Sequence, residues 1–97
     1  RGDGAVARRV AQMAHAAGID LVPHSWLTHL LTGYSLQLIA TLPRARFVEF
    51  NVSQSALTRG IAPARFTLEA DGTIAIPDSV DMGVRVDEAF IAAHRVN

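Results

Sequence analysis

The sequence predicts an α/β fold, in which helices cover a parallel sheet. In the first half of the chain, helical spacing of apolar residues alternates with short apolar runs, in the order helix, strand, helix, strand. This alternation is typical of parallel sheets whose strands are connected through helices. The second half has a turn dipeptide between two β-like runs and ends in a short helix, which predicts a differently built region.

The first helix is predicted over residues 5–17. Val6, Val10 and Met13 are spaced four and three residues apart, so they share one side of a helix. Gly18 follows as a left-handed stop, because glycine adopts that backbone conformation without steric cost. The segment is therefore predicted to be an amphipathic helix.

A strand, a helix and a second strand are predicted next. Residues 19–22 form the short strand, which Pro23 ends because proline cannot donate to a ladder. A helix is predicted over residues 27–41, with Gly33 as a weak point in its middle. The residues expected on its buried side are Leu27, Leu30, Leu31, Tyr34, Leu38 and Ile39. The apolar residues of 47–52 predict the second strand.

The second half is polar at first and then β-like. A short helical turn is expected near residues 55–58, followed by a hairpin whose two-residue turn is Asp71-Gly72. Residues 86–96 predict a terminal helix. A boundary between two regions is expected near residues 62–64.

Composition excludes several functional classes. The 97 residues carry a formal net charge of zero without a dense basic run, so a nucleic-acid partner is not expected. No apolar run reaches the roughly 18 residues that span a bilayer, so no membrane partner is expected. The chain has no cysteine and no lysine, which excludes thiolate and lysine-based catalysis from its residues. No secretory pattern is visible, and we expect a cytoplasmic protein.

Two titratable residues stand at matching places on the two predicted strands. His24 follows the first strand, and Glu49 lies inside or near the end of the second, between Val48 and Phe50. Functional residues of parallel α/β folds gather at the carboxyl ends of strands. A carboxylate and an imidazole there are a pairing typical of proton transfer. Taken singly, His24 is also compatible with a solvated loop residue without a catalytic role, and Glu49 with a residue on the solvent-exposed face of a strand.

The neighbouring polar residues give weaker predictions. Ser25 and Trp26 are weak candidates for substrate binding, with packing as the alternative for the tryptophan. His24 and His29 are five residues apart rather than the four of a helical metal pair, so a zinc site is not expected, and we assign no metal ligand in this chain.

Three stretches of the sequence resemble a known family. They read ARRVAQMAHAAGIDLVPHSW, LIATLPRARFVEF and DGTIAIPDSVDMGVRVDE. In this order they resemble the carboxyl-terminal part of enolase superfamily proteins, in the mandelate racemase and acid-sugar dehydratase branch. The resemblance extends over nearly the whole chain. It departs where the family commonly has P-G-L-G or P-G-V-G, because this chain has Val80-Asp81-Met82-Gly83.

The resemblance implies a fold in more detail. Residues 1–62 would supply the last two βα units of a modified (β/α) TIM-type barrel. Residues 63–97, with the hairpin and the terminal helix, would return to an α+β capping domain. A barrel of this kind needs about 250 residues, so the chain is expected to be a fragment of a larger protein.

The resemblance also implies a function. It predicts the carboxyl-terminal segment of a Mg²⁺-dependent enzyme that abstracts the proton α to a carboxylate, foremost an acid-sugar dehydratase. The alternatives are a racemase or epimerase of the same superfamily, and an inactive structural or interaction fragment. His24 matches the general base, and Glu49 matches an acid that hydrogen-bonds the intermediate. The Mg²⁺ ligands and an Asp partner of the base are expected upstream. The substrate is expected to be a small carboxylate such as a sugar acid, and the intact protein a homo-oligomer.

Overall fold

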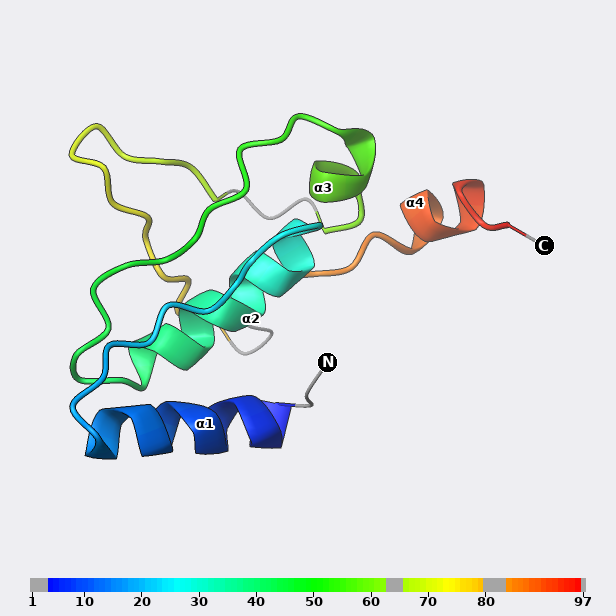
Figure 1. The fold of residues 1–97 in the computed structure, drawn as a ribbon. Helices are drawn as coiled ribbons and strands as arrows, with labels where there is room; N and C mark the ends of the chain where they lie inside the picture. The colour runs from blue at the N-terminus through cyan, green and yellow to red at the C-terminus, as the bar shows by residue number, and fades with distance from the viewer. Residues whose placement is uncertain (1–3, 63–65, 80–83, 97) are drawn as a thin grey trace.

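The computed structural model describes residues 4–62, 66–79 and 84–96. The described residues form four helices, and Figure 1 shows α2 in the middle of the molecule with α1 along one side. Their bounds are α1 Gly4–Ala16, α2 His29–Ala40, α3 Ala56–Gly60 and α4 Glu88–Ala93. Each helix lies within a segment predicted to be helical or within a few residues of it, so the four predicted helices are confirmed.

The predicted fold class is wrong. No part of residues 4–62, 66–79 and 84–96 forms a strand, so the structure does not contain βα units of a TIM-type barrel or a paired hairpin. The predicted strands 19–22 and 47–52 are irregular segments near α2 (Figure 1). Within the described residues, no backbone hydrogen bond joins these two segments to each other.

The physical reason lies in what defines a strand. An apolar run shows that side chains can be buried, but a strand also needs a neighbouring backbone to satisfy its N–H and C=O groups. Here side chains provide the connections instead. The backbone N–H of Ser25 donates to Glu49, and Asn51 donates to the backbone carbonyl of Leu27. The residues just after the first segment are therefore connected to the second segment without a ladder.

Helix α1 ends as predicted but does not bury its apolar stripe. Gly18 has φ +71°, and the N–H groups of Gly18 and Ile19 donate to the carbonyls of His15 and Ala14. This pair of bonds is the Schellman motif that closes a helix on a left-handed residue. The predicted stripe of Val6, Val10 and Met13 is exposed among the described residues, and the buried residue of α1 is Ala11.

Helix α2 buries a different face from the one predicted. Its buried residues are His29, Thr32, Gly33, Ser35, Leu36 and Ile39. Of the six residues expected on the buried side, Ile39 is buried, Leu27 is exposed and precedes the helix, and the others are half-buried. Gly33 permits a close approach, since a Cβ atom there would lie 2.0 Å from a methyl carbon of Val84.

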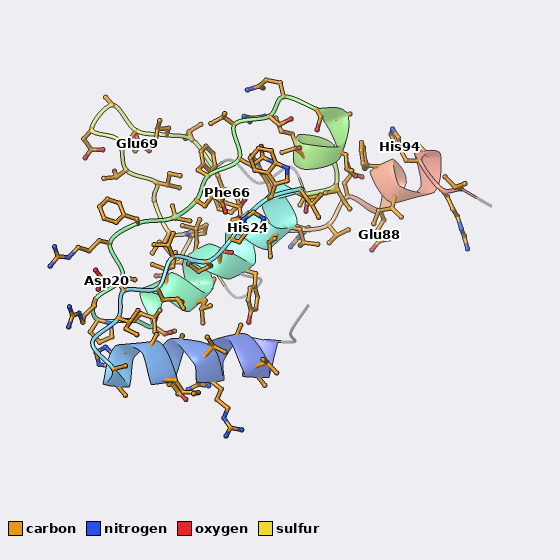
Figure 2. The ribbon with its side chains drawn as sticks, in the orientation of Figure 1. Asp20, His24, Phe66, Glu69, Glu88 and His94 are labelled. Atoms are coloured by element: carbon orange, nitrogen blue, oxygen red, sulfur yellow. The ribbon has the colours of Figure 1, made fainter. Side chains whose placement is uncertain are left out.

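The apolar core lies where α2 meets the later part of the chain. Leu36, Ala62, Phe66 and Val84 form a buried cluster. Half-buried apolar residues from several segments pack against it, namely Leu30, Val48, Phe50, Ile61 and Ile74. Figure 2 shows the position of Phe66 next to α2. The core is small, and the radius of gyration of 14.4 Å exceeds the value of about 12.5 Å typical of a compact domain of this length.

The turn of the predicted hairpin forms, although its strands do not. The N–H of Gly72 donates to Glu69 O over 2.9 Å, and the N–H of Glu69 donates to Thr73 O over 2.8 Å. The loop is therefore three residues long with Gly72 at φ +82°, rather than a two-residue Asp-Gly turn. Asp71 accepts hydrogen bonds from the amide and the hydroxyl of Thr73.

The terminal part is anchored by a cap. The Asp87 side chain accepts from Phe90 N over 2.9 Å and so caps α4, while the Asp87 N–H donates to Ile61 O. The predicted region boundary near residues 62–64 falls largely on residues 63–65, which lie outside the described residues, and it stays a prediction. Val80-Asp81-Met82-Gly83 also lies outside them. In the described part of the chain, no helix is long and apolar enough to cross a membrane.

Candidate active site

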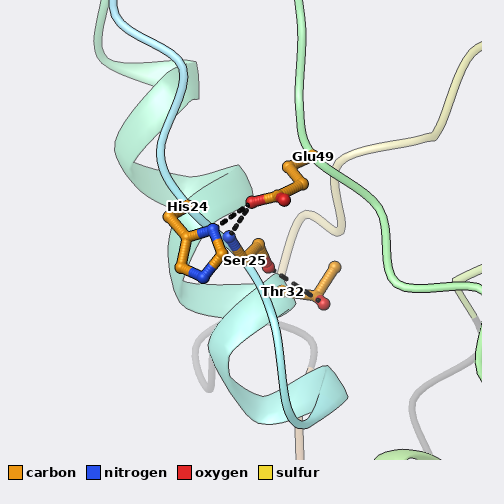
Figure 3. Close-up of polar contacts among 4 residues, drawn as sticks. All are labelled: His24, Ser25, Thr32 and Glu49. Carbon is orange, nitrogen blue, oxygen red and sulfur yellow. Dashed lines mark hydrogen bonds and ion pairs between the residues drawn. The ribbon is translucent and has the colours of Figure 1, made fainter.

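The structure brings His24 and Glu49 into direct contact. His24 Nδ1 lies 2.7 Å from Glu49 Oε2, within hydrogen-bond distance. The His24 side chain is 77% exposed and that of Glu49 is 38% exposed. Figure 3 shows the second ring nitrogen, Nε2, on the side of the imidazole away from the carboxylate. The imidazole is therefore held at Nδ1 by Glu49, while Nε2 lies on its opposite side.

Ser25 fixes the same carboxylate oxygen through its backbone. The Ser25 N–H donates to Glu49 Oε2 over 2.7 Å, so two donors converge on one atom (Figure 3). The Ser25 side chain is fully buried, and its hydroxyl donates to Thr32 Oγ1 over 3.3 Å. Trp26, two residues after His24 in the sequence, is exposed. The substrate-binding roles of Ser25 and Trp26, like the catalytic roles of the pair, stay predictions.

Leu27 ends the site loop, residues 24–27, in an unusual backbone conformation. Its φ is +80°, in the left-handed region that residues other than glycine rarely adopt. Two side chains donate to its carbonyl oxygen, Thr58 Oγ1 over 2.9 Å and Asn51 Nδ2 over 3.3 Å. Both donors are buried, with exposed fractions of 3% and 2%. The loop is therefore held at Ser25 by Glu49 and at Leu27 by two later residues.

A buried polar cluster underlies the site loop. Its members, which hydrogen bonds connect to the loop or to one another, are Ser25, His29, Thr32, Asn51 and Thr58. His29 Nε2 lies 3.3 Å from Asn51 O, and because a carbonyl can only accept, Nε2 carries the proton. The His29 ring stacks on Phe50, while its Nδ1 has no hydrogen-bond partner among the described residues. The cluster supports the loop mainly through side-chain to backbone hydrogen bonds.

Sequence reasoning missed His29, Asn51 and Thr58 as residues that shape the site. A usable pattern existed for the first of them. His29, Thr32, Gly33 and Leu36 follow the spacing i, i+3, i+4, i+7 of one helix face. A pattern of large apolar residues does not reveal this face, because His29, Thr32 and Gly33 are not large apolar residues. No local pattern indicates that Asn51 and Thr58 converge on Leu27, which is far from both in sequence.

The pair is not enclosed by the described residues. A hollow of about 320 Å³ lies between residues 45–50 and residues 68–76, and a second of about 240 Å³ lies between α1 and Leu21, Pro23 and Leu38. Neither hollow is lined by His24 or Glu49. The described residues also contain no group of three or more His, Asp or Glu side chains that could hold a metal ion. Figure 2 shows Glu69, Glu88 and His94 well apart from His24.

Comparison with known proteins identifies a family. The family described as enolase C-terminal domain-like matches residues 4–90 of the chain. This match covers almost all of the sequence and confirms its resemblance to the carboxyl-terminal part of enolase superfamily proteins. No curated protein matches the chain.

Proposed function

Because the chain belongs to the enolase C-terminal domain-like family, we propose that it is the carboxyl-terminal segment of an enzyme that abstracts the proton α to a carboxylate. The reaction that we propose is dehydration of a small sugar acid. The family match supports an enzyme at the level of the superfamily, and the choice of dehydration is our inference.

The observation that carries the proposal is the contact between His24 and Glu49. Glu49 Oε2 accepts a hydrogen bond from the Nδ1–H group of His24, which leaves the Nε2 lone pair available as the base. As Nε2 takes the α-proton, the electrons of the C–H bond move into the substrate carboxylate to give an enediolate. The imidazole becomes positively charged, and the adjacent carboxylate of Glu49 stabilises that charge. Expulsion of the β-hydroxyl, with a proton returned by the imidazolium, completes the loss of water.

This geometry gives Glu49 a different task from the one that the resemblance implies. The family pattern suggests an acid that hydrogen-bonds the intermediate, whereas Oε2 here holds His24 and the Ser25 amide. We therefore propose that Glu49 orients the base. A proton transfer of this type contributes on the order of 10²- to 10⁴-fold to a rate.

Enolase superfamily members usually bind Mg²⁺, which stabilises the charge on the substrate carboxylate when bound. The residues of the described ranges do not fit such a site, because they offer no group of three candidate ligands. We propose that any Mg²⁺ ligands come from outside the described residues, and the steps above involve only this chain's own groups.

Replacement of His24 tests the proposal in the full-length protein. A panel of aldonates and aldarates is incubated in deuterium oxide, and both deuterium incorporation at the α-carbon and loss of water are measured. In His24→Asn we expect both to disappear, because exchange reports the proton abstraction alone. His15→Asn is the matched control, since His15 is exposed on α1 and should leave both unchanged.

The outcomes separate the alternatives. Exchange without dehydration in His24→Asn would make His24 the acid that helps hydroxide leave. Inversion of the α-carbon without loss of water in the unchanged protein would indicate a racemase. Near-normal exchange and product formation in His24→Asn would show that His24 is neither the base that takes the α-proton nor the acid that helps hydroxide leave. Absence of exchange in the unchanged protein with every sugar acid would favour an inactive structural or interaction fragment.

A further inference from the structure

The site loop is held in a conformation that its own sequence does not favour. Leu27 has φ +80°, and its side chain is mostly exposed, so packing of that side chain does not explain the backbone geometry. Leucine avoids this region because its Cβ crowds the carbonyl oxygen. A conformation of this kind persists when the surroundings over-determine it.

The carbonyl oxygen of Leu27 shows what determines it. Thr58 Oγ1 donates to this oxygen over 2.9 Å, and Asn51 Nδ2 donates over 3.3 Å. The two donors come from different places, Asn51 from the segment after Glu49 and Thr58 from α3. We refer to the pair of donors, Asn51 and Thr58, as the Leu27 clamp.

Each donor of the Leu27 clamp is itself fixed. The Thr58 hydroxyl has one proton, and it uses this proton in the hydrogen bond to Leu27 O. In the second bond, to Ser55 Oγ at 2.7 Å, Thr58 Oγ1 is therefore the acceptor and the Ser55 hydroxyl is the donor. Asn51 Oδ1 accepts from Ser53 N over 2.9 Å, and Asn51 O accepts from His29 Nε2. The orientation of both donors is thereby determined by hydrogen bonds that are partly or fully buried.

The Leu27 clamp and Glu49 hold the same short loop from its two ends. Glu49 accepts from the Ser25 amide, and Leu27 lies two residues further along the chain. A change in φ at Leu27 rotates the peptide units before it, and so moves the Ser25 amide and the backbone that carries His24. We propose that Thr58 and Asn51 are positioning residues, which hold the strained Leu27 backbone so that His24 Nδ1 stays on Glu49.

This inference rests on the proposed function for its relevance to catalysis, but it has a readout of its own. If Glu49 accepts from Nδ1, the neutral imidazole of His24 is held as the tautomer with its proton on Nδ1. The ¹⁵N chemical shifts of a histidine-labelled full-length protein report which nitrogen carries the proton, and subtraction of a His24→Gln spectrum assigns the signal. This readout needs no substrate.

The test compares Thr58→Val with Thr58→Ser. Valine keeps the shape but removes the donor to Leu27 O, so the Nδ1–H tautomer should become a minority, and kcat should fall by about 10- to 100-fold with little change in KM. Serine keeps the hydroxyl and should recover most of both. Thr41→Val is a control, because Thr41 Oγ1 also donates to a backbone carbonyl, at the exposed end of α2.

A second variant tests the strain itself. Glycine adopts positive φ without the cost that leucine incurs. Leu27→Gly combined with Thr58→Val should therefore regain much of the Nδ1–H tautomer that Thr58→Val loses. If Thr58→Val does not fold, recovery of folding and of the tautomer in the double variant supports the inference, and failure of both overturns it.

The failures can be told apart. An unchanged tautomer and kcat in Thr58→Val would overturn the positioning role while leaving the proposed function intact. Loss of the tautomer in Thr58→Val, in a protein that exchanges no sugar acid, would support the Leu27 clamp and refute the proposed function.

Discussion

Gly33→Ala should destabilise the full-length protein, although alanine is the better helix former. Gly33 lies in the middle of α2, where replacement of glycine by alanine normally stabilises a helix by about 1 kcal/mol. At this position the new Cβ would lie 2.0 Å from Val84 Cγ2, whereas ordinary contact begins at 3.4 Å. The side chain of Val84 would therefore have to withdraw by about 1.4 Å.

The magnitude follows from what must move. A change of the Val84 rotamer does not suffice, because Val84 Cβ would still lie 3.2 Å from the new atom, closer than ordinary contact, and Phe66 Cζ, at 3.4 Å, would already be in contact with it. Both residues belong to the buried cluster, so the shift disturbs packing that stabilises the protein. Overpacking of a core costs about 1–3 kcal/mol. After the helical gain is subtracted, we expect a net loss of roughly 1 kcal/mol in the free energy of unfolding.

Urea denaturation of four proteins measures this effect as a double-mutant cycle: the unchanged protein, Gly33→Ala, Val84→Ala and the double variant. Val84→Ala removes Cγ2 and leaves Cβ at 3.2 Å, a contact that a shift of a few tenths of an ångström relieves, so Gly33→Ala should stabilise in that background by less than about 1 kcal/mol. The sign of the Gly33→Ala effect is thus expected to differ between the two backgrounds. If Gly33→Ala stabilises the protein when Val84 is present, the close packing of α2 against Val84 is refuted.

Three further predictions concern the chain as a whole, the site and the turn. Residues 1–97 expressed alone should not fold cooperatively, because among the described residues the buried apolar cluster has four members and many large apolar side chains are exposed. A sharp two-state thermal transition would contradict this. Glu49→Gln should lower kcat by about 10²-fold and affect KM much less, because the carboxylate stabilises the His24 imidazolium as it forms. An unchanged kcat in steady-state assays would show that Glu49 has a structural role only. Hydrogen bonds from Thr73, first from its hydroxyl and then from its amide, lower the pKa of the Asp71 carboxyl below the usual 3.8. The charged carboxylate therefore stabilises the turn above pH 3.8, and this contribution is lost as the pH falls through the lowered pKa. An NMR titration of the carboxyl carbon should show the lowered pKa, and a midpoint at or above 3.8 would disprove it.

The features that could be predicted from the sequence are local ones. The end of α1 follows from Gly18, whose positive φ completes a motif made of adjacent residues. The position of the turn likewise follows from adjacent residues, the Asp71-Gly72 dipeptide, although the loop is three residues long rather than two. His24 follows one apolar run and Glu49 lies within or near the end of the next, and the structure brings these two predicted site residues together.

The features that could not be predicted depend on distant segments. Whether residues 19–22 and 47–52 pair as strands depends on backbone partners that an apolar pattern does not specify. The positive φ of Leu27 has no local indication, because leucine is not a turn residue and the donors to its carbonyl follow more than twenty residues later. The buried face of α2 does not follow from the pattern of large apolar residues, because four of its six buried residues are polar or glycine.

The two kinds of buried contact around α2 differ in how they tolerate change. Leu36 and Phe66 are held by apolar packing, which is non-directional, so other apolar residues of similar volume can replace them at small cost. Asn51 and Thr58 are held by directional bonds to single acceptor atoms, and few side chains reproduce that geometry. Random substitution therefore has unequal consequences here: the apolar cluster can vary while the protein keeps its shape, whereas most changes beneath the site loop alter how its residues are presented.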